Sequence, residues 1–141
     1  MIYWDTSALV LCYESRAKDH SRARNLLLRE KHVACALIQV EAVSAIVRRL
    51  GDDKRKAKAI LDTMEDHLRH FVIVSLGEEV LEKAAAMAWA HRLRAADAIH
   101  VAAARNLARD LGRASFRVAT SDIEQAAAAR AEGLRVIEFQ P

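Results

Sequence analysis

The chain of 141 residues is 52% hydrophobic and 29% charged, which predicts one folded domain over residues 1–141 with a single continuous core. This composition excludes a disordered chain, and no apolar run is long enough to predict a membrane span. The net charge of +3 at pH 7 is compatible with a nucleic-acid partner but does not require one.

Short apolar segments alternate with amphipathic segments along the whole sequence. We predict five strands, at 2–4, 32–36, 71–74, 117–120 and 134–139. The first helices are predicted from 6 or 7 to 13 or 14, at about 20–30, up to about 50, and at about 53–68. Further helices are predicted at roughly 78–92 and 95–111, and after 122 up to 133. Strands that alternate with helices indicate a mainly parallel sheet with helices on both faces, a three-layer α/β/α architecture.

Three local details of these elements are also expected. Thr6 and Ser7 are N-cap candidates for the first helix, and the strand at 71–74 is apolar enough to be buried on both faces. The inward face of the helix ending near 50 is predicted from a three- and four-residue spacing: Val40, Val43, Val47 and Leu50. Glu41 is expected beside this apolar stripe, in the first turn of the helix.

Two features of the sequence indicate the cellular compartment. The first residues show no basic leader and no cleavage-site pattern, so we expect the protein to stay in the cytoplasm. Cys12 and Cys35 have no metal-type spacing and are interpreted as small buried residues in a reducing compartment.

Four acidic residues are expected at one end of the predicted sheet. Asp5, Glu41 and Asp122 fall at or just past the carboxyl ends of strands, where parallel sheets bind ligands. Asp97 lies in the first turns of the helix at 95–111, inside a run of small and apolar residues. Taken singly, each acid is typical of a helix cap, a turn, or a first-turn carboxylate that complements the helix dipole.

Taken together, the four acids predict a metal site. Neighbouring carboxylates repel one another unless a cation lies between them, and oxygen-only ligand sets suit hard ions such as Mg²⁺ or Mn²⁺. A divalent ion held in this way generates hydroxide from bound water and neutralises phosphate oxygens, and two ions clamp both sides of a displacement at phosphorus. The cluster therefore predicts metal-dependent cleavage of RNA without a side-chain nucleophile.

The sequence resembles the PIN domain family over essentially its whole length. The blocks that carry the resemblance are Ile2–Val10, Glu41, Leu93–Ala102, and Thr120–Asp122 with Ala127, Gly133, Leu134 and Val136. Within the family, the length and layout are similar to VapC-type toxins of bacterial toxin–antitoxin pairs. The resemblance is specific because the four blocks occur in order at these spacings.

This resemblance implies a parallel sheet in the order 3-2-1-4-5 and an endoribonuclease that uses Mg²⁺ or Mn²⁺. It also implies a homodimer and a cognate VapB-like antitoxin that blocks the site. The resemblance assigns catalysis and metal binding to four acids: Asp5, Glu41, Asp97 and Asp122. The residues that it implies in support of them are Thr6, Ser7 and Thr120.

The sequence departs from the family pattern at two places. Relatives often carry serine ahead of the helix with the glutamate, where this chain has Cys35 and Ala36. No second aspartate follows Asp122, and Glu124 is the nearest carboxylate.

Other residues have both a functional and a structural interpretation. His100, three residues after Asp97, is either a general base or a histidine satisfied by its neighbours. Arg94 either pairs with Asp97 or contacts substrate phosphate, and Trp4 and Trp89 are interpreted as core residues. A basic patch that either contacts RNA phosphate or forms a solvated face consists of Arg48, Arg49, Lys54 and Arg55, with Lys56 and Lys58 beside them.

Three other classes of protein fit part of the pattern. A haloacid dehalogenase-like phosphatase needs a second aspartate two residues after Asp5, where this chain has Ser7. A response-regulator receiver needs an aspartate after the third strand, where Ser75 stands. A catalytically weak PIN-fold module that only binds RNA is the non-enzymatic alternative, and the four acids favour an enzyme over it.

Overall fold

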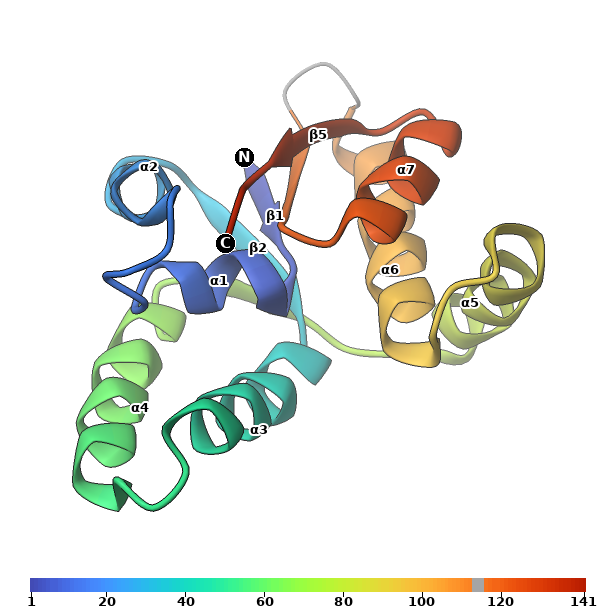
Figure 1. Ribbon diagram of the computed structural model, residues 1–141. Helices are drawn as coiled ribbons and strands as arrows, with labels where there is room; N and C mark the ends of the chain where they lie inside the picture. The colour runs from blue at the N-terminus through green and yellow to red at the C-terminus, as the bar shows by residue number, and fades with distance from the viewer. Residues whose placement is uncertain (113–115) are drawn as a thin grey trace.

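The computed structural model describes residues 1–112 and 116–141, which form one five-stranded sheet and helices on both of its faces (Figure 1). The strands are β1 (Ile2–Trp4), β2 (His32–Cys35), β3 (Val72–Val74), β4 (Arg117–Thr120) and β5 (Arg135–Glu138). Every neighbouring pair is parallel, in the order β3-β2-β1-β4-β5. The predicted parallel sheet and the strand order that the resemblance implies are both confirmed.

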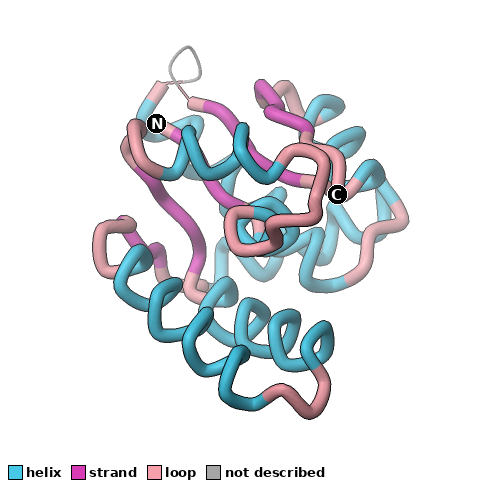
Figure 2. Tube along the Cα trace, turned by 60° about the vertical axis from the view of Figure 1, so that its left-hand side comes forward, coloured by secondary structure: helices cyan, strands magenta, loops and turns pink. Residues whose placement is uncertain are grey.

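The helices are divided between the two faces of the sheet (Figures 1 and 2). Their bounds are α1 (Thr6–Leu11), α2 (His20–Leu27), α3 (Leu37–Leu50), α4 (Lys54–Leu68), α5 (Glu78–His91), α6 (Ala95–Leu111) and α7 (Ile123–Ala131). Side chains of successive strand residues point to opposite faces. Ile2 and Trp4 of β1 therefore enter the core formed with α1–α4, while Tyr3 enters the core formed with α5–α7. The three-layer prediction is confirmed.

The predicted burial of β3 is wrong. Val72 is 59% exposed, and β3 is an outer strand that pairs with β2. An outer strand is covered less completely than a central one, so an apolar run does not by itself establish burial on both faces.

The predicted inward face of α3 is also wrong at its three valines. Val40, Val43 and Val47 are 71%, 48% and 46% exposed, whereas Leu50 is partly buried in the core. The residues of α3 that the core buries are Ile38, Ala42 and Ile46. Both sets recur at helical spacing, so α3 carries two apolar stripes, and packing on α1 and α4 selects the second.

The boundary between α5 and α6 lies where the sequence predicts it. Arg92 ends α5 in the left-handed conformation, with φ 56°, and Arg94 is the N-cap residue of α6. Asp97 is consequently the third residue of α6, a first-turn position rather than a cap. The small buried residues of α6 then pack this helix closely against the sheet and against α5: Ala98, Ala102, Ala103 and Ala104.

The two tryptophans lie in different environments. Trp4 is completely buried, as predicted, but Trp89 is 90% exposed, so its assignment to the core is wrong. The inward positions of α5 are taken by Ala84 and Met87, which leaves Trp89 on the outer side. Both cysteines are buried as expected. Within the described ranges, no helix combines the length and apolar character of a transmembrane span.

Candidate active site

Four carboxylates from four elements line one pocket of about 420 Å³. Asp5 follows β1, Glu41 is on α3, Asp97 is in the first turn of α6, and Asp122 precedes α7. The pocket is completed by Thr6, Ser7, Val40, Ser44, Arg48, Arg94 and Ala96. The structure thus brings together the four acids that the sequence singles out, because the carboxyl ends of β1 and β4 meet beside the starts of α3 and α6.

Asp5 both caps a helix and belongs to the pocket. It is 4% exposed, and its Oδ2 accepts hydrogen bonds from Ser7 N at 3.1 Å, from Ser7 Oγ, and from Thr120 Oγ1 at 3.1 Å. The N-cap of α1 is therefore Asp5, and the prediction that Thr6 and Ser7 cap this helix is wrong, because α1 already begins at Thr6. On its other oxygen, Asp5 accepts from Gln125 Nε2 at 3.3 Å. These donors hold the carboxylate in one orientation.

Glu41 lies in the second turn of α3, not in the first, because α3 begins four residues earlier at Leu37. Its Oε2 accepts hydrogen bonds from Thr6 Oγ1 and from His100 Nε2, each at 2.7 Å. Burial by itself would raise the pKa of Glu41, but the hydrogen bonds from His100 and Thr6 and the charge of His100 hold this pKa below its usual value. Glu41 is therefore an ionised group bound to a buried cation.

His100 is the positive partner at the centre of the site. Its ring is 2% exposed, and its Nε2 also lies 3.6 Å from Asp5 Oδ1. On the opposite side, its Nδ1 is 2.9 Å from the hydroxyl of Tyr3 and 3.6 Å from Cys35 Sγ. Burial lowers the pKa of His100, but its contacts with Cys35 and Glu41 and the charge of Asp5 outweigh burial and raise the pKa to about 10. Both ring nitrogens of His100 thus have partners among its neighbours, which favours the interpretation of a satisfied histidine over that of a general base.

Asp97 and Asp122 form the other side of the pocket and share one arginine. Arg94 Nε lies 3.3 Å from Asp97 Oδ2, and Arg94 Nη2 lies 3.4 Å from Asp122 Oδ2. Asp122 is also the N-cap of α7 and accepts from Gln125 N at 2.9 Å. The pKa of Asp97 is raised, first by burial and then by the charges of Asp122 and Asp5, and Arg94 compensates only in part. This side of the pocket is therefore short of positive charge.

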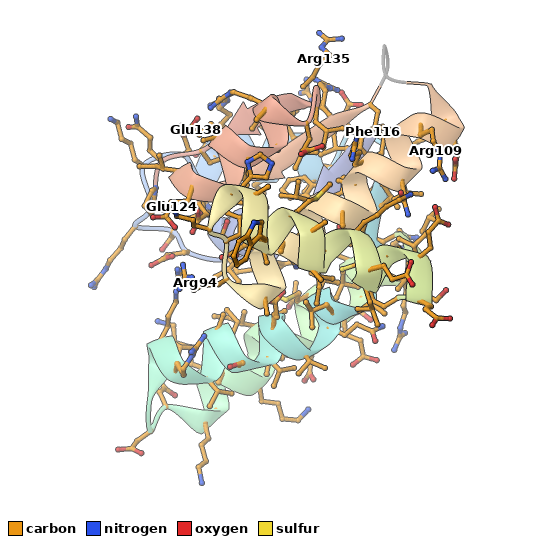
Figure 3. All side chains as sticks on the ribbon, turned by 90° about the vertical axis from the view of Figure 1, so that its right-hand side faces the viewer. Arg94, Arg109, Phe116, Glu124, Arg135 and Glu138 are labelled. Atoms are coloured by element: carbon orange, nitrogen blue, oxygen red, sulfur yellow. The ribbon has the colours of Figure 1, made fainter. Side chains whose placement is uncertain are left out.

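The oxygen donors on this side fit a hard divalent cation. Among residues 1–112 and 116–141, no three His, Cys, Asp or Glu side chains already form a coordination shell. Asp5, Asp97 and Asp122 nevertheless supply carboxylate oxygens to one pocket, and Arg94 is 78% exposed, so its side chain can withdraw into solvent. Glu124 is exposed on α7 and does not line the pocket (Figure 3).

The predicted basic patch is divided by the fold. Arg48 lines the acidic pocket, whereas Arg49 pairs with Glu14. Lys54 and Arg55 are exposed at the start of α4, where the α3–α4 hairpin projects away from the sheet (Figure 1). Of the seven basic residues named from the sequence, Arg48 and Arg94 are therefore the two that line the pocket.

Several residues of the site have no role in the sequence-based prediction. Ser44 lines the pocket one helical turn after Glu41, and Gln125 contacts Asp5 from one turn after Asp122. Ser44 and Gln125 could have been predicted from the sequence, because each is a polar residue one helical turn after a predicted site acid. Tyr3 could not have been predicted in this way, because its contact with His100 depends on how β1 and α6 pack.

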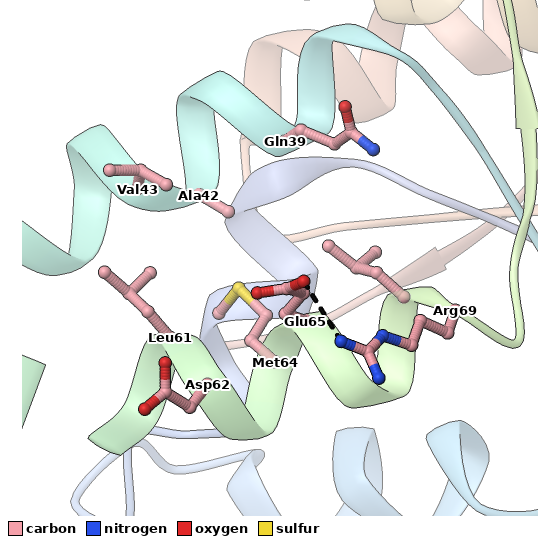
Figure 4. Close-up of a pocket in the computed structure, with 9 residues that line it drawn as sticks. Gln39, Ala42, Val43, Leu61, Asp62, Met64, Glu65 and Arg69 are labelled. Carbon is pink, nitrogen blue, oxygen red and sulfur yellow. Dashed lines mark hydrogen bonds and ion pairs between the residues drawn. The ribbon is translucent and has the colours of Figure 1, made fainter. Parts of the chain in front are cut away.

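A second pocket of similar size, about 430 Å³, lies between α3 and α4 (Figure 4). Its lining is largely apolar, with an ion pair between Glu65 and Arg69 at 3.3 Å on one side. The residues that line it are Gln39, Ala42, Val43, Leu61, Asp62, Met64, Glu65, Leu68 and Arg69. The four site acids are absent from this lining, so the groove is separate from the acidic pocket.

Comparisons with known proteins agree with this architecture. The model of the PIN domain family matches residues 2–131. Ribonuclease VapC46 of Mycobacterium tuberculosis (strain ATCC 25618 / H37Rv) is 32% identical over 136 residues, which are 96% of this chain and 95% of that protein.

Solved structures show the same fold at lower identity. FitAcB from Neisseria gonorrhoeae superposes with a TM-score of 0.70 at 22% identity, covering 98% of this chain and 97% of that chain. VapC20 of Mycobacterium tuberculosis, described as a Sarcin-Ricin loop cleaving toxin, gives 0.68 at 19% identity and covers all of both chains. A toxin–antitoxin complex from Klebsiella pneumoniae gives 0.65 at 17% identity, covering 90% of this chain and 91% of that chain.

Proposed function

The chain belongs to the PIN domain family and is VapC-like, and from this premise we propose that it is a Mg²⁺- or Mn²⁺-dependent endoribonuclease, the toxin of a VapBC-type toxin–antitoxin pair. The observation that supports this proposal most directly is the pocket into which Asp5, Glu41, Asp97 and Asp122 all converge. Ser7, which stands where a haloacid dehalogenase-like phosphatase needs an aspartate, donates to Asp5 and so serves as its support.

The proposed reaction is hydrolysis of an RNA phosphodiester bond. A water oxygen bonds to phosphorus, one ester P–O bond breaks, and the leaving ribose oxygen departs as a hydroxyl group with a proton that the water gives up. A divalent cation bound in the pocket would make that water acidic and neutralise phosphate oxygens. Asp5, Asp97 and Asp122 would hold the cation, and Glu41 completes the acidic cluster. Ser7 and Thr120 fix the orientation of Asp5 by donating to it. No side-chain nucleophile is required.

Arg48 and Arg94 are proposed to contact RNA phosphate, since both residues line the acidic pocket. Each phosphate contact by a cationic side chain releases counterions, so RNA affinity falls as salt rises. For Arg48→Glu we expect the slope of log affinity against log salt to flatten by about 0.7 or more, the value for one contact to a single strand. Binding to a fluorescent RNA oligonucleotide over a range of salt concentrations measures this slope. Arg29→Glu is the matched control, because Arg29 is exposed and lies outside the pocket, and an equal effect of both variants would contradict the assignment.

A cognate antitoxin is the proposed protein partner, since toxin–antitoxin complexes are among the structural neighbours. The exposed valine stripe of α3 gives such a partner an apolar surface beside the site. Val40 lines the acidic pocket, and Val43 lines the groove between α3 and α4 (Figure 4). A chain that covers these two valines therefore also covers part of the lining of the acidic pocket. The homodimer is proposed from family membership alone, and light scattering of the purified protein measures it.

The test of the proposed function is cleavage of RNA by the purified chain. We expect cleavage with Mg²⁺ or Mn²⁺, none in excess chelator, and recovery when the ion is restored. We also expect inhibition by the cognate antitoxin. RNA binding without cleavage under all metal conditions would instead support the catalytically weak module. Cleavage that persists in chelator would contradict the metal-dependent mechanism.

A further inference from the structure

The two sides of the acidic pocket differ in which side chain lies between their carboxylates. On one side, the buried ring of His100 lies between two acids, with Nε2 at 2.7 Å from Glu41 Oε2 and at 3.6 Å from Asp5 Oδ1. On the other side, Asp97 and Asp122 share the guanidinium of Arg94, which is 78% exposed.

His100 is fixed in its place, unlike the exposed arginine. Its side chain is 2% exposed, and its Nδ1 is 2.9 Å from the hydroxyl of Tyr3, which is itself completely buried on β1. The two rings meet edge to face with their centres 5.9 Å apart. Residues beside His100 on α6 belong to the same core, which holds the backbone of this turn: Ala98, Val101 and Ala102. A metal ion placed between Asp5 Oδ1 and Glu41 Oε2 would have to displace this buried ring.

The protein holds Glu41 through one of its two carboxylate oxygens. Its Oε2 already accepts from two donors at 2.7 Å, Thr6 Oγ1 and His100 Nε2. Charge-assisted hydrogen bonds of this length are strong, and breaking them would leave a buried donor unpaired. The contacts therefore favour Glu41 as a partner of His100 and Thr6 over Glu41 as a direct metal ligand.

We propose that the site takes one divalent cation, held by Asp97 and Asp122 together with Asp5, and that His100 fills the place between Asp5 and Glu41 that a second ion would need. Two-metal phosphodiesterase sites hold their ions about 3.5–4 Å apart, so a second ion would have to contact the carboxylates that His100 already contacts. Glu41 is then a positioning residue that fixes His100. This inference rests on the proposed metal-dependent function and specifies how many ions the site holds.

The stoichiometry of Mn²⁺ binding tests the proposal on the unmodified full chain. After removal of metal with chelator, titration calorimetry is expected to give one Mn²⁺ per chain, and the electron paramagnetic resonance spectrum that of an isolated ion. Two ions per chain, or the spectrum of a coupled pair, would overturn the one-ion proposal while supporting metal dependence. An absence of binding would overturn both this proposal and the metal-dependent function, so the two failures are distinguishable.

Two substitutions separate a ligand from a positioning residue. Glu41→Gln keeps an acceptor oxygen for Thr6. We expect this variant to bind one Mn²⁺ with a Kd within about threefold of the unmodified chain. Removing a group that supports a metal site typically weakens metal affinity about tenfold or more. Asp97→Asn is expected to raise the Kd at least about tenfold. Glu124→Gln is the matched control for the glutamate, because Glu124 is exposed and does not line the pocket. Equal losses of Mn²⁺ affinity in Glu41→Gln and Asp97→Asn, with both variants folded by circular dichroism, would overturn the proposal.

Discussion

Asp5→Asn is expected to slow RNA cleavage by at least about a hundredfold, which corresponds to about 2.7 kcal/mol of activation free energy, while the protein remains folded. The loss of rate follows from the charge, because an amide is a poor substitute for a carboxylate in holding a divalent cation. Cleavage rates with excess RNA, at the Mn²⁺ concentration that saturates the unmodified chain, measure the loss.

The fold is expected to survive because asparagine retains the capping function of Asp5. The oxygen of the new amide still accepts from Ser7 N, and asparagine is as good an N-cap as aspartate. The new NH₂ group faces Gln125, whose Oε1 is buried and has no hydrogen-bond partner among the described residues. Rotation of the Gln125 amide therefore supplies an acceptor for it.

A matched control separates capping from catalysis. Asp53 is the N-cap of α4 and accepts from Lys56 N at 3.0 Å, but it does not line the acidic pocket. Asp53→Asn is expected to cleave RNA at the unmodified rate. If Asp5→Asn retained full activity, or lost activity only because its melting temperature collapsed, the metal-binding role of Asp5 would be wrong.

The convergence of the acids was predictable because topology constrains it. In a parallel sheet the carboxyl ends of neighbouring strands lie at one edge, so Asp5 after β1 and Asp122 after β4 meet whatever their side-chain details. The first-turn position of Asp97 followed from the break at Arg92–Arg94. The positions of these three acids depend mainly on where strands and helices begin and end, which periodicity and turn residues indicate locally.

Contacts between distant elements were not predictable in the same way. His100 and Glu41 are 59 positions apart and meet only because α6 and α3 approach each other at the pocket. The buried face of α3 was missed for the same reason. Its two apolar stripes satisfy helical spacing equally, and only the position of α1 and α4 decides between Ile38 and Val40 as the inward residue.

Asp97→Asn is expected to abolish cleavage and at the same time to stabilise the metal-free protein at neutral pH. The pKa of Asp97 is raised in the folded state by burial and by the charges of Asp122 and Asp5, so its ionisation opposes folding. The stability that the protonated side chain contributes is fully present below its unfolded pKa of about 3.9 and is lost as pH rises through the folded pKa. Asparagine carries no charge and does not incur this loss.

The stability difference between Asp97→Asn and the unmodified chain therefore has a defined dependence on pH and metal. In chelator, urea denaturation should show the variant as the more stable protein near pH 7, with the difference vanishing below about pH 4. With saturating Mn²⁺ at pH 7, the unmodified chain should instead be the more stable protein. A ligand present at 100 times its Kd stabilises the folded state by about 2.7 kcal/mol, and the variant binds Mn²⁺ poorly. Asp110→Asn, at the exposed end of the same helix, is expected to respond to Mn²⁺ as the unmodified chain does. An Mn²⁺-independent stability difference would mean that Asp97 is repelled by its neighbours without serving as a ligand, and the metal would have to be held by other groups.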